Sequence, residues 1–324
     1  MRWSKPRRRY LPGIVALTIA LGTVPAAALG RGRAPAPKAA TFVAAEITNA
    51  VSFSRGLTAL PTGAPDPYLQ SGLGEFVAHC PLTHRAAHDP IVGPGNANFW
   101  HSHDFFGNVT TNHLSTVENL DGQATSCSPT VDDSAYWVPT LLKNGAPIDP
   151  THITIYYQVK RPYDPTKVLP FPHGLRMIAG DAMAMSAQPD YVEQWHCIGT
   201  STSAATIPDC GADDVELVLT FPNCWDGVHL DSVNHKSHLF YGRGLNCPTS
   251  HPVVVPEMSF RFRWSASGPG VALSSDAMSG HAMPGGTTAH GDFINTWDDA
   301  ELSRRVSGCL NVAHVCNEAG NVIR

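Results

Sequence analysis

Short stretches in which apolar and polar residues alternate run through the chain and predict β-strands. Residues 152–159 are rich in β-branched and aromatic side chains and lie between two proline-containing turns. Residues 215–221 and 258–264 alternate with the period of two that sends successive side chains to opposite faces. In 258–264 the three aromatic residues share one face and the two arginines share the other, which is typical of a half-buried strand.

Two further elements have less regular signals. Residues 136–142 predict a strand that Pro139 confines to an edge or a bulge, because proline has no backbone N–H to donate. Helix is scarce. Its best segment is 297–306, where Asp298 can cap the first turn and Glu301 completes the spacing of a capping box.

Long polar stretches, rich in the chain's 28 Gly and 27 Pro residues, separate these elements. We therefore predict a mainly β fold, a β-sandwich or jelly-roll-like single domain with long loops and few short helices, over residues 71–324. Residues 29–70 begin with a run of Pro, Ala and basic groups that cannot bury a core, and they predict a flexible leader and approach segment.

Residues 1–28 have the pattern of a secretory signal peptide. A basic start without acids precedes a short apolar run, which ends on the small residues 26–28. The three arginines at 7–9 resemble a twin-arginine export signal, and a plain basic start is the alternative. We expect a secreted or extracytoplasmic protein. No later stretch is apolar for long enough to span a bilayer, so we expect no membrane span in the mature form.

Charge narrows the range of partners. The first 28 residues hold five of the 22 basic residues and none of the 27 acids, so the remaining chain has 17 basic and 27 acidic residues, a formal net charge of −10. This balance argues against nucleic acid and anionic membrane surfaces as partners. It leaves glycans, cations and proteins open, and it says nothing of the oligomeric state.

All eight cysteines follow the predicted signal peptide, and an even number in an exported chain predicts disulfides. Neighbouring positions favour the pairs Cys197 with Cys210 and Cys309 with Cys316, and Cys224 with Cys247 is a further candidate, although eight cysteines allow 105 pairings. A zinc site is the competing interpretation, but the chain has no C-x-x-C pair.

Histidines and acids gather in three places. The first is 101–104 (HSHD), where an extended backbone would point His101 and His103 to the same side, within reach of one metal ion. The second is 224–238, which has two acids and three histidines, and the third comprises His281 and the run 290–293 (HGDF). We predict that some of these side chains line a polar site. The candidate metal ligands, for a divalent transition metal, are His101, His103, His235, His238 and His290, and the candidate catalytic acids are Asp104, Asp226, Asp231 and Asp292.

Whether this site is catalytic stays open at this point. The two hydrolase chemistries are acid–base cleavage of a glycosidic bond, with Asp226 or Asp231 as acid or base, and metal-assisted hydrolysis. A third interpretation is that the histidines and acids form only buried hydrogen-bond networks. The chain has no H-E-x-x-H or G-x-S-x-G motif, no phosphate loop and no dinucleotide fingerprint.

The order of several motifs resembles the DUF1996 family, a secreted actinobacterial and fungal domain of unknown function. These motifs are HDPIVGPG (88–95), HSHDFFGN (101–108), YWVPTL (136–141), GLRMIAGD (174–181), FPNCWDG (221–227) and HKSH (235–238), and the resemblance spans about 76–316. Some fungal relatives are joined to carbohydrate-binding modules, so the resemblance implies a cell-envelope protein that acts on or binds polysaccharide. The alternative is a non-catalytic module that binds carbohydrate or metal.

Overall fold

The computed structural model describes residues 74–159, 162–200, 203–244, 246–277 and 284–324. The predicted signal peptide, the predicted leader and His281 lie outside these residues. Among the described residues, no helix is both long and apolar enough to cross a bilayer.

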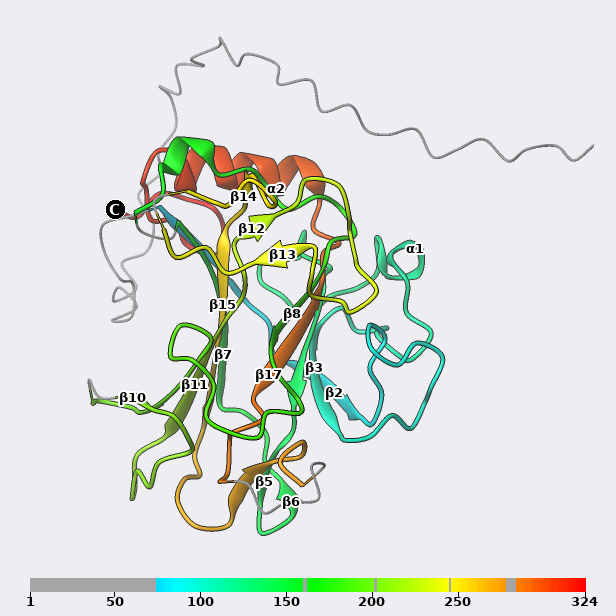
Figure 1. Cartoon of the computed structure of the whole chain (residues 1–324), viewed down its shortest axis with the longest axis vertical. Helices are drawn as coiled ribbons and strands as arrows, with labels where there is room; N and C mark the ends of the chain where they lie inside the picture. Colours follow the sequence, from blue (N-terminus) through cyan, green and yellow to red (C-terminus); the bar gives the residue numbers. More distant parts are fainter. Residues whose placement is uncertain (1–73, 160–161, 201–202, 245, 278–283) are drawn as a thin grey trace, which may run out of the picture. The chain divides into compact units, whose positions relative to one another are not determined.

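Two antiparallel sheets form the body of the fold (Figure 1). The six-stranded sheet has the order β1 (Glu75–His79), β7 (His152–Gln158), β15 (Glu257–Trp264), β11 (Val215–Thr220), β9 (Glu193–Cys197) and β10 (Ser203–Ala204). The five-stranded sheet has the order β2 (Leu82–Ala86), β3 (His103–Gly107), β4 (Ala135–Pro139), β17 (His290–Ile294) and β8 (Arg176–Gly180).

Smaller elements close the ends of these sheets. One three-stranded sheet has the order β13 (Leu239–Phe240), β12 (Cys224–Trp225) and β14 (Val253–Val254), and another has β16 (Val271–Leu273), β5 (Leu141–Lys143) and β6 (Ala146–Pro147). The helical segments are α1 (Val117–Leu120), the 3-10 turn η1 (Pro165–Lys167), α2 (Asp299–Arg305) and the π-helical turn η2 (Val306–Leu310). The predicted mainly β, sandwich-like fold with few short helices is confirmed.

The main hydrophobic core lies between the two large sheets. In Figure 1, β7, β11 and β15 form one layer and β3, β8 and β17 form the other. The aromatic face predicted on β15 points into this core, where Phe260, Phe262 and Trp264 have no exposed surface. Phe106 and Phe293 reach it from the opposite sheet. The alternation seen in the sequence therefore produces the packing between the sheets.

The predicted helix is confirmed, and its first turn is capped as expected, because the side chain of Asp298 accepts a hydrogen bond from the backbone N–H of Glu301 at 2.8 Å. The edge position predicted for the strand around Pro139 is wrong. β4 lies between β3 and β17, but its pairing with β17 reaches only Trp137, and Pro139 ends the strand two residues later. At that position the missing N–H costs no ladder bond to β17.

The eight cysteines form four disulfides, and none is free. The three expected pairs, Cys197–Cys210, Cys224–Cys247 and Cys309–Cys316, are confirmed, and the fourth bond joins Cys80 to Cys127. Cysteine ligation of zinc is therefore excluded. Each bond removes conformational freedom from the unfolded chain, which stabilises the long loops between the strands.

A buried chain of polar groups crosses the main core. The hydroxyl of Tyr136 donates to the carboxyl of Asp132 at 2.7 Å and lies 2.7 Å from the hydroxyl of Tyr157, which accepts from the Trp297 indole N–H at 2.9 Å. Asp132 has no exposed surface, and burial raises the pKa of its carboxyl to about 7.

We predict that Asp132 makes stability fall as pH rises. Its folded-state pKa lies above its unfolded value, so its stabilising contribution is present below about pH 4 and is lost as the pH rises through 7. The free energy of unfolding of Asp132→Asn, relative to wild type, should increase by roughly 2 to 4 kcal/mol between pH 4 and pH 8. Urea unfolding in the presence of EDTA measures this difference. Asp164→Asn, at an exposed N-cap, is the control and should show no such change. If the difference in unfolding free energy between Asp132→Asn and wild type were the same at pH 4 and pH 8, as expected for the control, the raised pKa of Asp132 would be contradicted.

Candidate functional site

The outward face of the five-stranded sheet carries a second, smaller core that also holds polar groups. Along β17, Phe293 points into the main core, whereas His290, Asp292 and Ile294 point outward. Along β3, His103 and Phe105 point outward in the same way. The apolar members of this second core are Ile91, Phe105, Leu120, Ala135, Trp137, Ile178 and Ile294.

The register of the sheet brings the two strand histidines together. His103 pairs directly with Pro139 of β4, and β17 pairs with the other side of β4 at Asp292 and Trp137. Counting two residues along each antiparallel strand from that pair places His290 level with Pro139 as well. The imidazoles of His103 and His290 therefore meet over the end of β4.

The connection between β2 and β3 covers this face and completes the cluster. Figure 1 shows the connection and α1 on the side of β3 that faces away from the six-stranded sheet. Ile91 from this segment belongs to the second core, and the connection returns to β3 through His101. Trp100, immediately before it, has a positive φ of 55°, which marks the sharp change in chain direction there.

Three imidazole nitrogens converge at this place. The Nε2 atom of His290 lies 3.2 Å from Nε2 of His101 and 3.4 Å from Nε2 of His103. All three rings are buried, with exposed fractions of 7% for His101, 0% for His103 and 4% for His290. We call these residues the histidine cluster.

Backbone carbonyls fix the orientation of two of the rings. Nδ1 of His103 donates to the carbonyl of His88 at 2.9 Å, and Nδ1 of His290 donates to the carbonyl of Thr288 at 2.8 Å. Burial lowers the pKa of His101 and of His290 to about 3 and that of His103 well below its ordinary value, so the rings are neutral at pH 7. In a neutral ring protonated at Nδ1, Nε2 carries only a lone pair. His103 and His290 therefore face each other with two acceptors.

A carboxylate without hydrogen-bond partners lies beside the cluster. Both side-chain oxygens of Asp292 are buried and have no partner. Asp292, Asp89 and His103 place their ligand atoms within 4.8 Å of one another. Burial and the nearby Asp89 raise the pKa of Asp292 well above its ordinary value, and the ammonium of Lys236 acts in the opposite direction. Asp89 itself accepts hydrogen bonds from the backbone N–H groups of Ile91 and Val92.

Asp104 does not join this cluster, although it follows His103 directly. Its side chain points to the other face of β3, where it accepts from the guanidinium of Arg85 and from the hydroxyl of Thr140 at 2.8 Å. Arg85 also forms an ion pair with Asp149 at 2.9 Å. The structure therefore places Asp104 in a partly buried charge network rather than among the imidazoles.

The remaining predicted residues stabilise the loop between β12 and β13. Asp226 accepts from the backbone N–H of Val228 and of His229, and it lies 2.6 Å from the His229 ring. Although burial raises its pKa, these hydrogen bonds outweigh that effect, and the net pKa of Asp226 is below its ordinary value. Asp226 is therefore ionised at neutral pH.

Asp231, His235 and His238 fasten the same loop to β8. Asp231 is paired with Arg176 at 3.2 Å and with the ring of His235 at 2.9 Å. The buried ring of His238 donates from Nε2 to the carbonyl of Arg176 at 2.8 Å. These contacts hold Lys236 where its ammonium donates to the carbonyl of Gly180, opposite His290 in the sheet. The loop thus borders the cluster without supplying an imidazole to it.

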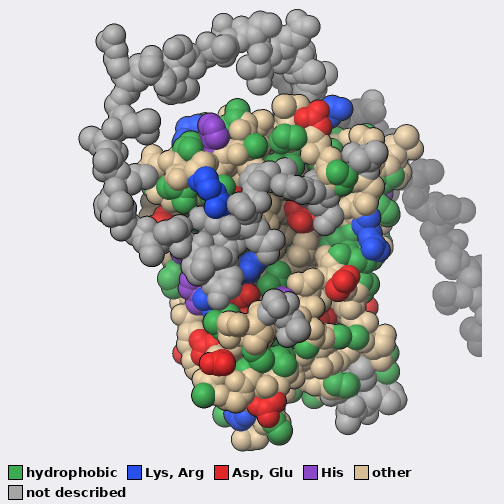
Figure 2. Space-filling model, turned by 90° about the vertical axis from the view of Figure 1, so that its left-hand side faces the viewer, with side chains coloured by type: hydrophobic (Ala, Val, Ile, Leu, Met, Phe, Trp, Pro, Cys, Tyr) green, Lys and Arg blue, Asp and Glu red, His purple; other side chains and the backbone are tan. Residues whose placement is uncertain are grey.

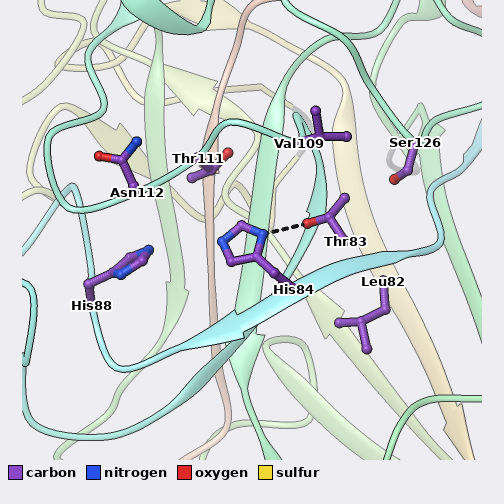
Figure 3. Close-up of a pocket in the computed structure, with 8 residues that line it drawn as sticks. All are labelled: Leu82, Thr83, His84, His88, Val109, Thr111, Asn112 and Ser126. Atoms are coloured by element: carbon purple, nitrogen blue, oxygen red, sulfur yellow. Dashed lines mark hydrogen bonds between the residues drawn. The ribbon is translucent and has the colours of Figure 1, made fainter.

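Sequence reasoning assigned no role to His88, Asp89 or Lys236. The backbone of His88 orients His103, and its ring lines a separate cavity of about 470 Å³, where Figure 3 shows it beside His84 and Asn112. The signal available in the sequence was that a histidine and an acid, His88 and Asp89, are adjacent. In the structure, the carbonyl of His88 orients the His103 ring, and the carboxyl of Asp89 approaches that of Asp292.

These observations define a class, a disulfide-bonded β-sandwich with a buried histidine cluster on the outward face of one sheet. The chain belongs to the family described as domain of unknown function (DUF1996), whose family model matches residues 89–297. The match includes every member of the histidine cluster together with Asp89 and Asp292. No curated protein and no solved structure matches the chain.

We predict that His238→Ala lowers stability without affecting the histidine cluster. Removal of the ring leaves the partly buried carbonyl of Arg176 without its donor, which should reduce the free energy of unfolding by about 1 to 3 kcal/mol. Denaturant unfolding measures the loss, and His229→Ala, at a side chain that is 64% exposed, should change stability by less than about 0.5 kcal/mol. A folded His238→Ala variant that had lost bound metal would show that His238 is a ligand.

Proposed function

We propose that this protein is an exported metalloprotein of the cell envelope that acts on polysaccharide, with one divalent transition metal bound by His101, His103 and His290. Four disulfides and the pattern of residues 1–28 support the extracytoplasmic location. The two separations measured from His290 Nε2, to Nε2 of His101 and of His103, carry the metal assignment.

That spacing matches tetrahedral coordination. Two nitrogens bonded to one zinc ion at about 2.0 to 2.1 Å, with a tetrahedral angle between them, are about 3.3 Å apart. The two separations measured from His290 Nε2 are 3.2 and 3.4 Å. The carbonyls that hold Nδ1 of His103 and His290 are the outer-shell partners that metal-bound histidines normally have.

A hydrogen-bond network alone explains this arrangement less well. His101 can donate from Nε2 to His290, which would satisfy that contact. His103 cannot, because its single proton is on Nδ1, so its Nε2 lone pair would face that of His290 at 3.4 Å in a buried site. A cation among the three nitrogens removes this repulsion. It also balances the buried carboxylate of Asp292, which otherwise has no partner.

The three proposed histidine ligands would leave one coordination position of the metal open. Three protein ligands and one open position are typical of catalytic zinc sites, where the metal lowers the pKa of a bound water molecule to about 7. Asp292 lies beside the cluster with both oxygens unpartnered. A cation there would lower its raised pKa, and we assign the ionised carboxylate the role of proton acceptor for a water at the open position. Acid–base cleavage of a glycosidic bond by two carboxyl groups alone needs one of them protonated. Hydrogen bonds keep Asp226 ionised, so Asp226 does not suit the role of that acid.

We predict about one transition-metal ion per chain in mature protein that is purified without chelator or affinity nickel and then dialysed against zinc. The substitutions His103→Ala and His290→Ala should each abolish binding, because two imidazoles hold the ion far more weakly than three. Elemental analysis by mass spectrometry gives the metal content. His314→Ala, which removes an exposed imidazole, is the matched control.

Asp292→Asn distinguishes the metal centre from a hydrogen-bond network. With EDTA present, the substitution should raise the melting temperature, and more so at higher pH, because burial disfavours ionisation of Asp292 and its oxygens have no partner. With zinc present, the gain should shrink or reverse, because the carboxylate then compensates the cation. A zinc-independent effect, together with no metal in wild type, would refute the metal centre.

We predict metal-dependent release of reducing ends from at least one member of a panel of envelope polysaccharides. Activity should be lost on treatment with EDTA, return with zinc, and be absent in His103→Ala. A reducing-sugar assay after size fractionation measures it. Metal-dependent binding without turnover would instead assign the chain to the non-catalytic alternative, and neither binding nor turnover across the panel would contradict a role on polysaccharide.

A further inference from the structure

A cavity of about 390 Å³, lined in part by Ile178 and Gly180 of β8, lies next to the strand that carries His290. Two of its lining side chains are hydrogen-bonded to backbone close to His290. Lys236 donates to the carbonyl of Gly180, which pairs with His290, and the amide of Gln188 donates to the carbonyls of Thr287 and Ala289. The cavity therefore shares its frame with the proposed metal centre, and its volume falls in the range of small-molecule sites.

The lining of this cavity combines cations with aromatic rings. The guanidinium carbon of Arg243 lies 4.2 Å above the ring of Tyr191, which in turn packs edge to face against Tyr241 at 5.6 Å. Phe240 is 48% exposed at the same cavity. The cation–π contact holds the guanidinium in place and leaves its N–H groups available.

The two cations are not neutralised by protein carboxylates. Within the described part of the chain, neither Lys236 nor Arg243 forms an ion pair, and both side chains are exposed. The one acid that lines the cavity, Asp181, turns toward its own loop and accepts the backbone N–H of Met183. The cavity thus has two free cationic groups in a chain whose mature part is predicted to be strongly acidic.

Cations do not gather in the same way on the face drawn in Figure 2. There, Lys and Arg side chains are scattered singly among acids and neutral residues. At physiological ionic strength, charges farther away than about 8 Å are largely screened, so a ligand in the cavity is affected mainly by Lys236 and Arg243.

We propose that this cavity is the subsite for an anionic sugar unit, with Lys236 and Arg243 binding its carboxylate or phosphate group and Tyr191 and Phe240 packing against its ring. The proposal rests on the proposed function and names its substrate class as an acidic glycan. A fork-shaped guanidinium suits a carboxylate or phosphate, and the exposed ring of Phe240 with the half-buried ring of Tyr191 suits the apolar face of a sugar.

Calorimetric titration of the mature protein at physiological ionic strength tests this subsite. The probes are tetragalacturonate, its fully methyl-esterified form, which has the same rings without charge, and a short glycerol phosphate oligomer. We expect saturable binding of at least one anionic probe and at least tenfold weaker binding of the neutral ester, since one charge-assisted hydrogen bond accounts for about that ratio. The two anionic probes distinguish a carboxylated from a phosphorylated ligand.

Matched variants assign the binding to the cavity. Lys236→Gln and Arg243→Gln should each weaken binding of the anionic probe about tenfold, whereas Arg243→Lys keeps the charge and should retain part of it. Lys167→Gln removes one cation that does not line the cavity and should have no effect. Equal affinity for the charged and the esterified probe, or no binding of any probe, would overturn the proposal.

Each titration is repeated with zinc-loaded and EDTA-treated protein, which separates this inference from the metal centre. Binding of the acidic probe to a chain that takes up no metal would support the subsite while refuting the proposed metal centre. One bound metal ion without binding of any acidic probe would leave the metal centre in place and refute the subsite.

Discussion

Three neutral imidazoles and the unpartnered side chain of Asp292 share one buried place on the outward face of the five-stranded sheet, and the proposed function depends on how these groups coexist. Because the protons of His103 and His290 are held on Nδ1 by backbone carbonyls, their Nε2 lone pairs must face each other. Polar groups in such positions are costly unless a partner compensates them. The proposed cation would accept the lone pairs of His103 and His290 and would lie close enough to Asp292 to balance its ionised form.

The pairing of the strands and the connection between β2 and β3 bring these side chains together. β4 pairs with β3 on one side and β17 on the other, and it ends at Pro139, so the two strand histidines lie level with each other above its end. The connection between β2 and β3 then covers the site and brings in His101. On another side, the ion pair of Asp231 with Arg176 and the buried ring of His238 fasten the loop that places Lys236 beside His290. One loop thus links the proposed metal centre to the proposed acidic-sugar subsite.

Local pattern predicted the parts of the fold that depend on neighbours in the sequence. The strand 258–264, the cap formed by Asp298 and the three short-range disulfides were all predicted, because period-two alternation, capping and short loop closure are local rules. The position of β4 was not predicted, since the pairing of strands far apart in the sequence decides whether a proline-ended strand is central. The fourth disulfide, Cys80–Cys127, follows only by elimination once the other three are known.

The candidate site divides in the same way. The i, i+2 spacings of His101 with His103 and of His290 with Asp292 identified residues that share a face, and the sheet then brings the two pairs together. The same alternation sends Asp104 to the opposite face once β3 is known to begin at His103, but the boundary of the strand was not predicted. Spacing also could not show that Asp226, Asp231, His235 and His238 form the internal contacts of a neighbouring loop. The most direct measurement is an anomalous difference map from crystals of the zinc-loaded mature protein. The account predicts one peak about 2.0 to 2.1 Å from Nε2 of His101, His103 and His290. No peak there, with the three rings held by hydrogen bonds alone, would contradict it.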